Sequence, residues 1–495
     1  MSHSELEADG AYRRYQIETR DAADIVPWPS RFNVRVKRFG LARLILSEAI
    51  HYRGQREVIL SRPCVYGVFS GPVGGFAPRD RLCVGCLRCT TQYPEWVSVL
   101  PNPERRELGD SYFTFEHVNT IAYEASGGRV PVRGAGYRGP FGGEGWDGMW
   151  TDMSEIVRPT RDGIHGREFI STSIDVGAKP SFLRFDQSGR SCGESPCTFS
   201  LPLPFLFDLP PAAVATPLLY RIYSQAAADL DTLVMLPARA IVDLNLRGAH
   251  IVPLLAPGDL ELVRVLPSTP RLAMLDGWSP ALDDTLYQEV RRYLPETQIG
   301  LRTRFPTAEK LLAHVAHGIK IFHLTANYHG RDPEGTFVFD QIRSAHKTLV
   351  DARIREEITL LGSGGIIAAE HVPKAIIAGL DGVVLDTPLL VALQARFAGD
   401  FTNRRMTNLR LPAKLELGWG VQRLKNLAAA WRDQLLEILG AMGMREVRRL
   451  RGEIGRAMFQ SDLEREAFAG IEGYEEEYES GIEQESGIEN PDGVC

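Results

Sequence analysis

The chain has 495 residues, too many for one hydrophobic core, so two or three domains are expected. Hydrophobic residues make up 44% of the chain and charged residues 24%, which is typical of a globular protein. The sequence contains no run of about eighteen apolar residues, so a membrane span is not expected. The N-terminal stretch MSHSELEADGAYRRYQ lacks the apolar core of a signal peptide, so a cytoplasmic location is expected.

The formal net charge of −7 is concentrated at the C-terminal end. Residues 470–495 contain nine acidic residues and no Lys or Arg, so the rest of the chain is near neutral. A near-neutral body excludes the basic field that nucleic acids or anionic membranes would require. The tail repeats Gly-Ile-Glu and is rich in Gly, Ser and Glu, a composition that predicts disorder.

Composition divides the chain into five segments. They are an N-terminal leader (1–60), a cysteine-bearing and glycine-rich approach (61–200), an α/β domain (201–400), a C-terminal helical extension (401–469) and the acidic tail (470–495).

Two of these segments contain amphipathic stretches. In the leader, residues 32–52 predict a helix with Leu41, Ile45 and Leu46 on one face. In the extension, GVQRLKNLAAAWRDQLLEILGAMG predicts a long helix, and MREVRRLRGEIGRAMF predicts a second one.

Three cysteines lie close together in CVGCLRCTTQYP, residues 83–94. Cys83, Cys86 and Cys89 have the C-x2-C-x2-C spacing of bacterial ferredoxins, and Tyr93 occupies the place of the fourth cysteine. Because the fourth ligand of such a cluster can come from elsewhere in the chain, Cys64 is the candidate, and a [4Fe–4S] cluster on these four cysteines is expected.

Two alternatives remain for the cysteines. One is a [3Fe–4S] cluster on the last three, and the other is zinc, whose structural sites usually pair two separated knuckles. Cys192 and Cys197, in CGESPC, are interpreted as incidental, and Cys495 as a free thiol.

From residue 201 to about 390 short β-rich runs alternate with helical stretches. Repeated β-then-α units predict parallel strands with right-handed crossovers, and eight units fit a closed (β/α)8 barrel. A doubly wound open sheet is the alternative. The predicted strands are LPFLFD, TLVML, HIVPLL, RLAMLD, QIGLRTRF, IKIFHLTANY, ITLLGSGG and GVVLDT.

The last two predicted strands end in sequences that suit a phosphate. The seventh ends in Gly362-Ser363-Gly364-Gly365, and the eighth in Asp386-Thr387-Pro388. Glycines allow the backbone to approach a ligand closely, and a helix N-terminus offers free N–H donors to an anion. In such barrels phosphates often lie at these two loops.

These residues carry a family resemblance. The run SAHKTLVDARIREEITLLGSGGIIAAEHVPKAIIAGLDGVVLDTPLL resembles the end of the FMN-binding synthase domain of glutamate synthases, and KNLAAAWRDQLLEILGAMGMREVRRLRGE resembles the helical segment that follows it. The similarity covers roughly residues 200–460, and the leader cysteines are similar to those of members with a ferredoxin-like leader. The resemblance implies a flavin barrel next to an iron–sulfur cluster.

The same resemblance implies roles for individual residues. It places the FMN phosphate on Ser363, Gly364, Gly365 and Thr387, and it puts Arg302 where family members carry a flavin-side lysine. A fixed cation there stabilises negative charge on a reduced flavin ring.

The sequence also departs from the family in two places. Asp386 replaces the usual glycine at the end of the eighth strand, and its carboxylate would repel a phosphate if it faced one. The glycine-rich, lysine-bearing stretch of the 2-oxoglutarate site is not recognisable in ARAIVDLNLRGAHIVPLLAPGD.

Further candidates lie at strand ends or in loops. His329, just beyond the sixth strand, is a candidate for contact with substrate or flavin, and His323 lies within that strand. Asp208 and Asp276, which close the first and fourth strands, suit acid–base work or helix capping. Arg158, Arg161 and His165 are interpreted either as an anion site or as salt-bridging residues.

The leading hypothesis is an FMN and iron–sulfur oxidoreductase, for which the resemblance implies reductive amination of 2-oxoglutarate to glutamate. The alternatives are a non-catalytic electron-relay or scaffold subunit with a degenerate barrel, and a related flavin enzyme with another amino-group substrate. Ser2 rather than Cys follows Met1, and no nicotinamide-binding motif is present, so a separate amidotransferase subunit and ferredoxin are expected as partners.

Overall fold

The computed structural model describes residues 15–53, 55, 64–131, 142–152, 170–179, 184–192, 197–278, 284–398, 408–469 and 471. Arg158, Arg161, His165, Cys495 and nearly all of the acidic tail lie outside these residues. Within the described part, no helix combines the length and the apolar character needed to cross a bilayer.

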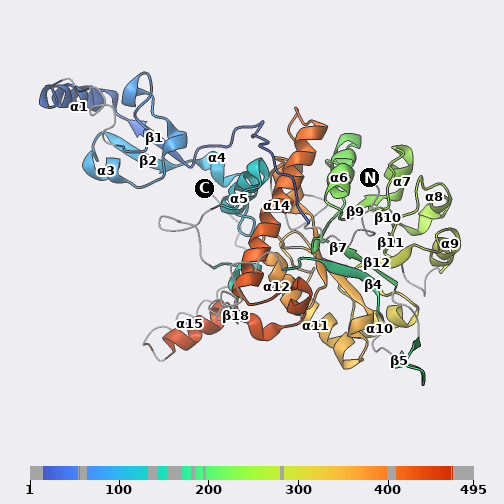
Figure 1. Cartoon of the computed structure of the whole chain (residues 1–495). Coiled ribbons are helices and arrows are strands. Elements are labelled where there is room, and N and C mark those ends of the chain that lie inside the picture. The colour runs from blue at the N-terminus through green and yellow to red at the C-terminus, as the bar shows by residue number, and fades with distance from the viewer. Residues whose placement is uncertain are drawn as a thin grey trace, which may run out of the picture.

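Eight parallel strands form a closed barrel, which confirms the predicted (β/α)8 fold (Figure 1). The first and last strands pair with each other, with Val383 opposite Phe205, so the open-sheet alternative is excluded. The strands are β8 (Phe205–Phe207), β9 (Val234–Pro237), β10 (Ile251–Leu255), β11 (Leu272–Asp276), β12 (Gln298–Arg304), β13 (Ile321–Thr325), β14 (Thr359–Ser363) and β15 (Gly382–Leu385).

Helices follow the strands and cover the outside of the barrel (Figure 1). The helices after β9 and β15 have six residues each, and the helix after β10 has five. The helices are α6 (Pro217–Asp229), α7 (Ala238–Asp243), α8 (Leu260–Arg264), α9 (Thr285–Tyr293), α10 (Ala308–Ala316), α11 (Val338–Asp351), α12 (His371–Ala378) and α13 (Thr387–Ala392).

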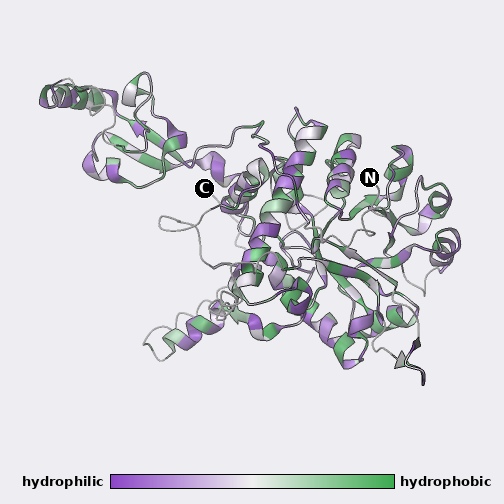
Figure 2. Ribbon diagram, in the orientation of Figure 1, coloured by the Kyte–Doolittle hydropathy of each residue, from purple (hydrophilic) through white to green (hydrophobic). Residues whose placement is uncertain are grey.

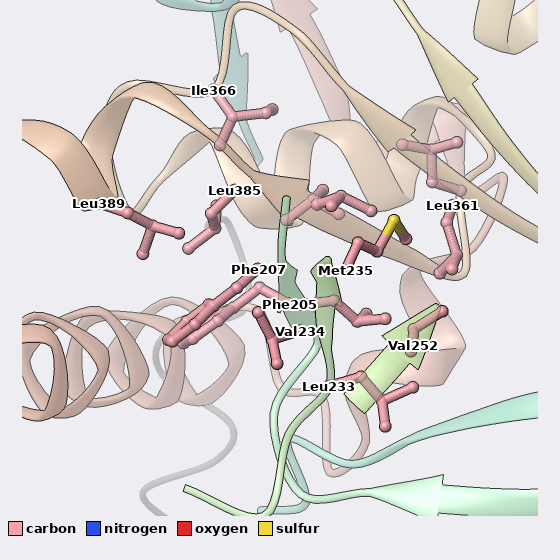
Figure 3. Packing of buried hydrophobic residues seen from close by; sticks show 14 of the residues in the cluster. Phe205, Phe207, Leu233, Val234, Met235, Val252, Leu361, Ile366, Leu385 and Leu389 are labelled. Atoms are coloured by element: carbon pink, nitrogen blue, oxygen red, sulfur yellow. The ribbon is translucent and has the colours of Figure 1, made fainter. Parts of the chain in front are cut away.

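The barrel strands are hydrophobic because both of their faces are covered. All five residues of β14 are buried, and Figure 2 shows hydrophobic residues along the central strands. Figure 3 shows side chains of β8, β9 and β10 packed with Leu361 of β14 and Leu385 of β15. Burial of each such side chain stabilises the fold by about 1.5–3 kcal/mol, so the core holds the strand ends in fixed positions.

The leader forms a small unit of its own that projects from the barrel (Figure 1). Its two strands, β1 (Phe32–Val36) and β2 (Val97–Pro101), pair antiparallel, and α1 (Arg38–His51) follows β1. The prediction of a helix over residues 32–52 is right for α1 and wrong for β1, because β2 supplies a strand partner 60 residues away in sequence. Leu41 of α1 is buried, whereas Leu46 is 65% exposed.

The C-terminal extension contains α14 (Leu417–Ala441), as predicted, and this helix packs against α5 (Phe115–Gly127) and α6. The predicted second helix is wrong. Short 3-10 turns occupy this stretch, followed by β18 (Ala457–Phe459) and α15 (Gln460–Phe468). Gly452 adopts a φ of 76°, and Arg451 turns back to pair with Asp381, so the chain folds onto the barrel rather than continuing as a helix.

Arg423 of α14 joins three distant segments. Its side chain is fully buried, pairs with Asp24 at 2.9 Å and donates hydrogen bonds to the carbonyl oxygens of Ala22, Ala122 and Ala392. A buried guanidinium is tolerated only when its donors are satisfied in this way. The contact therefore ties the leader and α5 to the end of α13.

A second buried arginine holds a histidine in its neutral form. Arg355 donates from Nε to His346 Nδ1 at 3.0 Å, and it also pairs with Asp381 at 2.8 Å. Burial, followed by the nearby positive charge of Arg355, lowers the pKa of His346 to about 4. An imidazole nitrogen accepts a hydrogen bond only when it carries no proton.

The pH dependence of stability tests this arrangement. Between pH 6.5 and about 4 the unfolded chain takes up a proton at His346 and the folded chain does not, so the unfolding free energy falls as the pH falls. The substitution His346→Gln, which removes this titration, is expected to reduce the loss of thermal midpoint between pH 7 and pH 5. The control is His51→Gln on the exposed face of α1. Parallel pH profiles for wild type and His346→Gln would contradict the assignment.

Candidate functional site: the barrel mouth and the leader cysteines

Three charged residues predicted from strand ends meet at the mouth of the barrel. Arg302 of β12 lies 3.4 Å from Asp208, which follows β8, and 3.5 Å from Asp276 at the end of β11. The Asp208 side chain is fully buried and that of Arg302 is 16% exposed. The guanidinium therefore lies between two carboxylates, and its charge is compensated within the chain.

The turn after β14 has the backbone shape that its glycines predict. Gly364 and Gly365 have φ values of 116° and 71°. A side chain at Gly364 would collide with the carbonyl oxygen of Asn327, and one at Gly365 with the Tyr112 hydroxyl. The Tyr112 hydroxyl donates to the Gly365 carbonyl at 2.7 Å, so a residue of the approach segment already covers this turn.

The hydroxyls expected to hold a phosphate are bonded within the chain. Ser363 Oγ lies 3.0 Å from His323 Nε2, and both side chains are buried. The Asp386 carboxylate accepts from the Thr387 backbone N–H at 2.5 Å and from the Thr387 hydroxyl at 3.0 Å. Asp386 thus caps α13 at the point where a phosphate would need the same donors.

Because β14 and β15 are neighbours, these two turns lie at the same edge of the barrel. A carboxylate at the N-terminus of α13 accepts hydrogen bonds from the donors at the start of this helix, and it places negative charge at that end. In this arrangement Thr387 does not fit a dianionic phosphate, since the Asp386 carboxylate accepts from both of its donors and would repel the phosphate. The structure brings the predicted residues together and fills the corner with the chain's own groups.

The approach segment that contains Tyr112 also covers His329. Its Nε2 is 2.5 Å from Asp110 Oδ2, and its ring stacks on Tyr112 with centroids 5.2 Å apart. Asp110 also accepts from the backbone N–H groups of Tyr112 and Phe113, which fixes this segment as a tight turn. Sequence reasoning missed Asp110 and Tyr112. The Gly-Asp-Ser sequence signals a turn there, but nothing in it points to the barrel mouth.

The predicted cysteine ligands lie in one region of the leader. Cys89 of α3 (Arg88–Gln92) is buried in the small core that Cys64 and Cys83 also contact, whereas Cys86 is exposed. Burial raises the pKa of the Cys83 and Cys89 thiols, and the neighbouring charges of Cys64 and Cys86 act in the same direction. The small core thus brings three of the four predicted ligands together.

The loop between Cys83 and Cys89 turns sharply at two residues with positive φ values. Gly85 and Leu87 have positive φ values of 70° and 59°, and the ring of Phe32 fills the space beside Gly85. Tyr93, in place of the fourth ferredoxin cysteine, stacks on Trp96.

Arg302 offers a test of the charge balance at the mouth. The substitution Arg302→Met removes this counter-charge from the buried Asp208 carboxylate, and we expect it to lower the unfolding free energy by about 3 kcal/mol in a urea titration. Adding Asp208→Asn to Arg302→Met is expected to restore more than half of the loss. Equal unfolding midpoints for the single and double variants would show that the two side chains are not coupled.

Comparison with known proteins agrees with this architecture. Residues 325–445 match the family described as the conserved region in glutamate synthase. The chain is 23% identical over 446 residues to the archaeal-type glutamate synthase [NADPH] of Dehalococcoides mccartyi, covering 76% of this chain and 86% of that protein. It is 22% identical over 449 residues to the archaeal glutamate synthase [NADPH] of Archaeoglobus fulgidus, covering 75% and 84%.

Among solved structures, a flavocytochrome b2 mutant with pyruvate bound aligns with 71% of this chain and 83% of its own, at 12% identity and a TM-score of 0.40. The matched residues 325–445 contain the glycine turn after β14, the capped start of α13 and the whole of α14. The two long sequence alignments extend the similarity over three quarters of the chain. The chain is therefore similar to archaeal-type glutamate synthases over most of its length, and residues 325–445 match the conserved region of that family.

Proposed function

We propose that this chain is an electron-transferring component of a glutamate synthase-type oxidoreductase, with an iron–sulfur cluster on Cys64, Cys83, Cys86 and Cys89. The observation that supports it is the contact of Cys64, Cys83 and Cys89 with one small core of the leader, with the exposed Cys86 in the loop between Cys83 and Cys89. When bound, such a cluster supplies one-electron transfer. The names of the two relatives support the wider reaction class.

The protein groups around the cysteines divide the pocket into two sides. Cys89 anchors the buried side, next to Val34 and Val97, and excludes water from it. Cys86 lies on the exposed side, together with the exposed Arg81 and Arg88. Positive charge beside the exposed ligand favours an acidic electron carrier such as ferredoxin as the partner.

The cluster is tested by anaerobic purification with analysis of iron and sulfide. Wild type is expected to carry about four irons per chain, or about three for the [3Fe–4S] alternative. Cys83→Ser is expected to lose most of this iron, because one of the more buried ligands is removed. Cys197→Ser, which changes an exposed cysteine of β7 (Cys197–Leu201), is the matched control. Full iron content in Cys83→Ser, or zinc in place of iron, would refute the assignment.

The barrel in this proposal serves as the scaffold of the relay. The position of Asp386 favours this role, since its carboxylate holds the donors of Thr387. The separate amidotransferase subunit expected from the sequence would then act with a catalytic partner rather than with this barrel.

A catalytic synthase with FMN, reducing the imine of 2-oxoglutarate to glutamate, is the second candidate. One observation favours it: Arg302 Nε is buried at the barrel mouth and makes no hydrogen bond within the described part of the chain. The positive φ values of Gly364 and Gly365 also keep the shape of a phosphate turn. This candidate requires the Asp386 side chain to leave the N-terminus of α13.

Flavin content separates the two candidates. Wild type is expected to purify with far less than one FMN per chain, and Asp386→Gly to bind more, because the repelling carboxylate is gone. Asp386→Asn removes the charge while keeping a helix cap, whose loss costs about 1 kcal/mol, and so controls for stability. One tightly bound FMN per wild-type chain would overturn the relay role and establish the catalytic candidate.

A further inference from the structure

A second group of potential metal ligands lies where the approach segment meets the barrel. Asp147 comes from the short 3-10 helix η5 (Gly145–Gly148), and Glu370 and His371 come from the start of α12. One ligand atom from each of these three residues lies within 4.8 Å of the other two. Asp147 Oδ1 and His371 Nε2 are 2.8 Å apart.

Second contacts orient two of these side chains. His371 is fully buried, and its Nδ1 lies 3.3 Å from the Gly365 carbonyl oxygen, which directs Nε2 toward Asp147. The other carboxylate oxygen of Asp147 lies 3.1 Å from His117 Nε2, and His117 Nδ1 lies 2.9 Å from the Thr114 hydroxyl. Metal-binding histidines and carboxylates are usually fixed by such outer contacts.

We propose that Asp147, Glu370 and His371 bind a divalent transition-metal ion, with His117 positioning Asp147. Imidazole combined with carboxylates suits Zn²⁺, Fe²⁺ or Co²⁺. Bonds of about 2.0–2.2 Å place neighbouring ligand atoms roughly 3–3.5 Å apart, close to the spacing of Asp147 and His371. Glu370 completes the set by a rotation of its side chain, which is 44% exposed.

Lys374 is the one neighbour that opposes a metal. Its ammonium donates to the Trp146 carbonyl oxygen at 2.8 Å and lies 3.9 Å from Glu370. The direct hydrogen bond is to Trp146, and the longer ion pair engages only Oε1 of Glu370. A bound ion would fasten η5 to the start of α12, five residues after Gly365.

The same contacts have a competing explanation without a metal. His371 Nδ1 also lies 3.2 Å from the Ile367 backbone nitrogen, and in that tautomer Nε2–H donates to Asp147. The group would then be a hydrogen-bonded network, and Glu370 would take no part in it. The two explanations differ in what Glu370 does.

Titration of Co²⁺ into the full-length protein, with its cysteine site intact, distinguishes them. We expect one ion to bind per chain with the weak visible bands of nitrogen and oxygen ligation and without the strong thiolate charge-transfer band. Glu370→Gln is expected to weaken binding at least about tenfold, and Asp147→Asn to abolish it. Glu334→Gln, in an exposed loop, is the matched control.

Glu370→Gln keeps every hydrogen bond among His117, Asp147 and His371, so it remains informative if Asp147→Asn fails to fold. Unchanged Co²⁺ affinity in Glu370→Gln, absence of binding by wild type, or a thiolate band alone would overturn the proposal. The proposal stands independently of the iron–sulfur assignment, because Cys83→Ser is expected to leave this binding unchanged.

Discussion

Closure of the barrel is the constraint on which the rest of the structure depends. Pairing of β15 with β8 satisfies the last strand edge and places all eight carboxyl ends at one mouth. For this reason Asp208, Asp276 and Arg302 meet although 94 residues separate the first from the last. The buried strands hold these groups in place, so their charges balance within a fixed geometry.

The approach segment completes this mouth from outside the barrel. Asp110 and Tyr112 cover His329 and the Gly365 turn, and Arg423 fastens the leader to α13 and α14. These contacts are hydrogen bonds and ion pairs between buried groups, where the loss of one partner leaves the other unsatisfied. The leader and the barrel therefore share one network, even though the cysteine-bearing unit projects from it.

The electrostatics of the mouth favour internal pairing over an external anion. Asp386 takes the donors at the start of α13, while Asp208 and Asp276 compensate Arg302. In the leader, Cys64, Cys83 and Cys89 instead contact one small core and Cys86 is exposed. This contrast supports the proposal of electron transfer in the leader and a scaffold role for the barrel.

The sequence by itself determined the features that depend on residues close to one another in the chain. The alternation of β-rich and helical runs predicted all eight barrel strands, and Gly364-Gly365 predicted the turn after β14. The C-x2-C-x2-C spacing predicts a metal or cluster site. Each of these patterns reflects backbone preferences or spacing within a few residues. The helix α14 was predictable for the same reason.

Only the tertiary structure decided the features that need a distant partner. Phe32–Val36 is a strand because Val97–Pro101 lies beside it. Val447–Leu450 and Ile454–Arg456 form 3-10 turns in place of the predicted second helix, with Arg451 paired to Asp381. The direction of the Asp386 carboxylate and the cover provided by Tyr112 decide whether the barrel corner is open. Side-chain direction and long-range hydrogen bonds depend on which segments the fold brings together, and local sequence does not encode that.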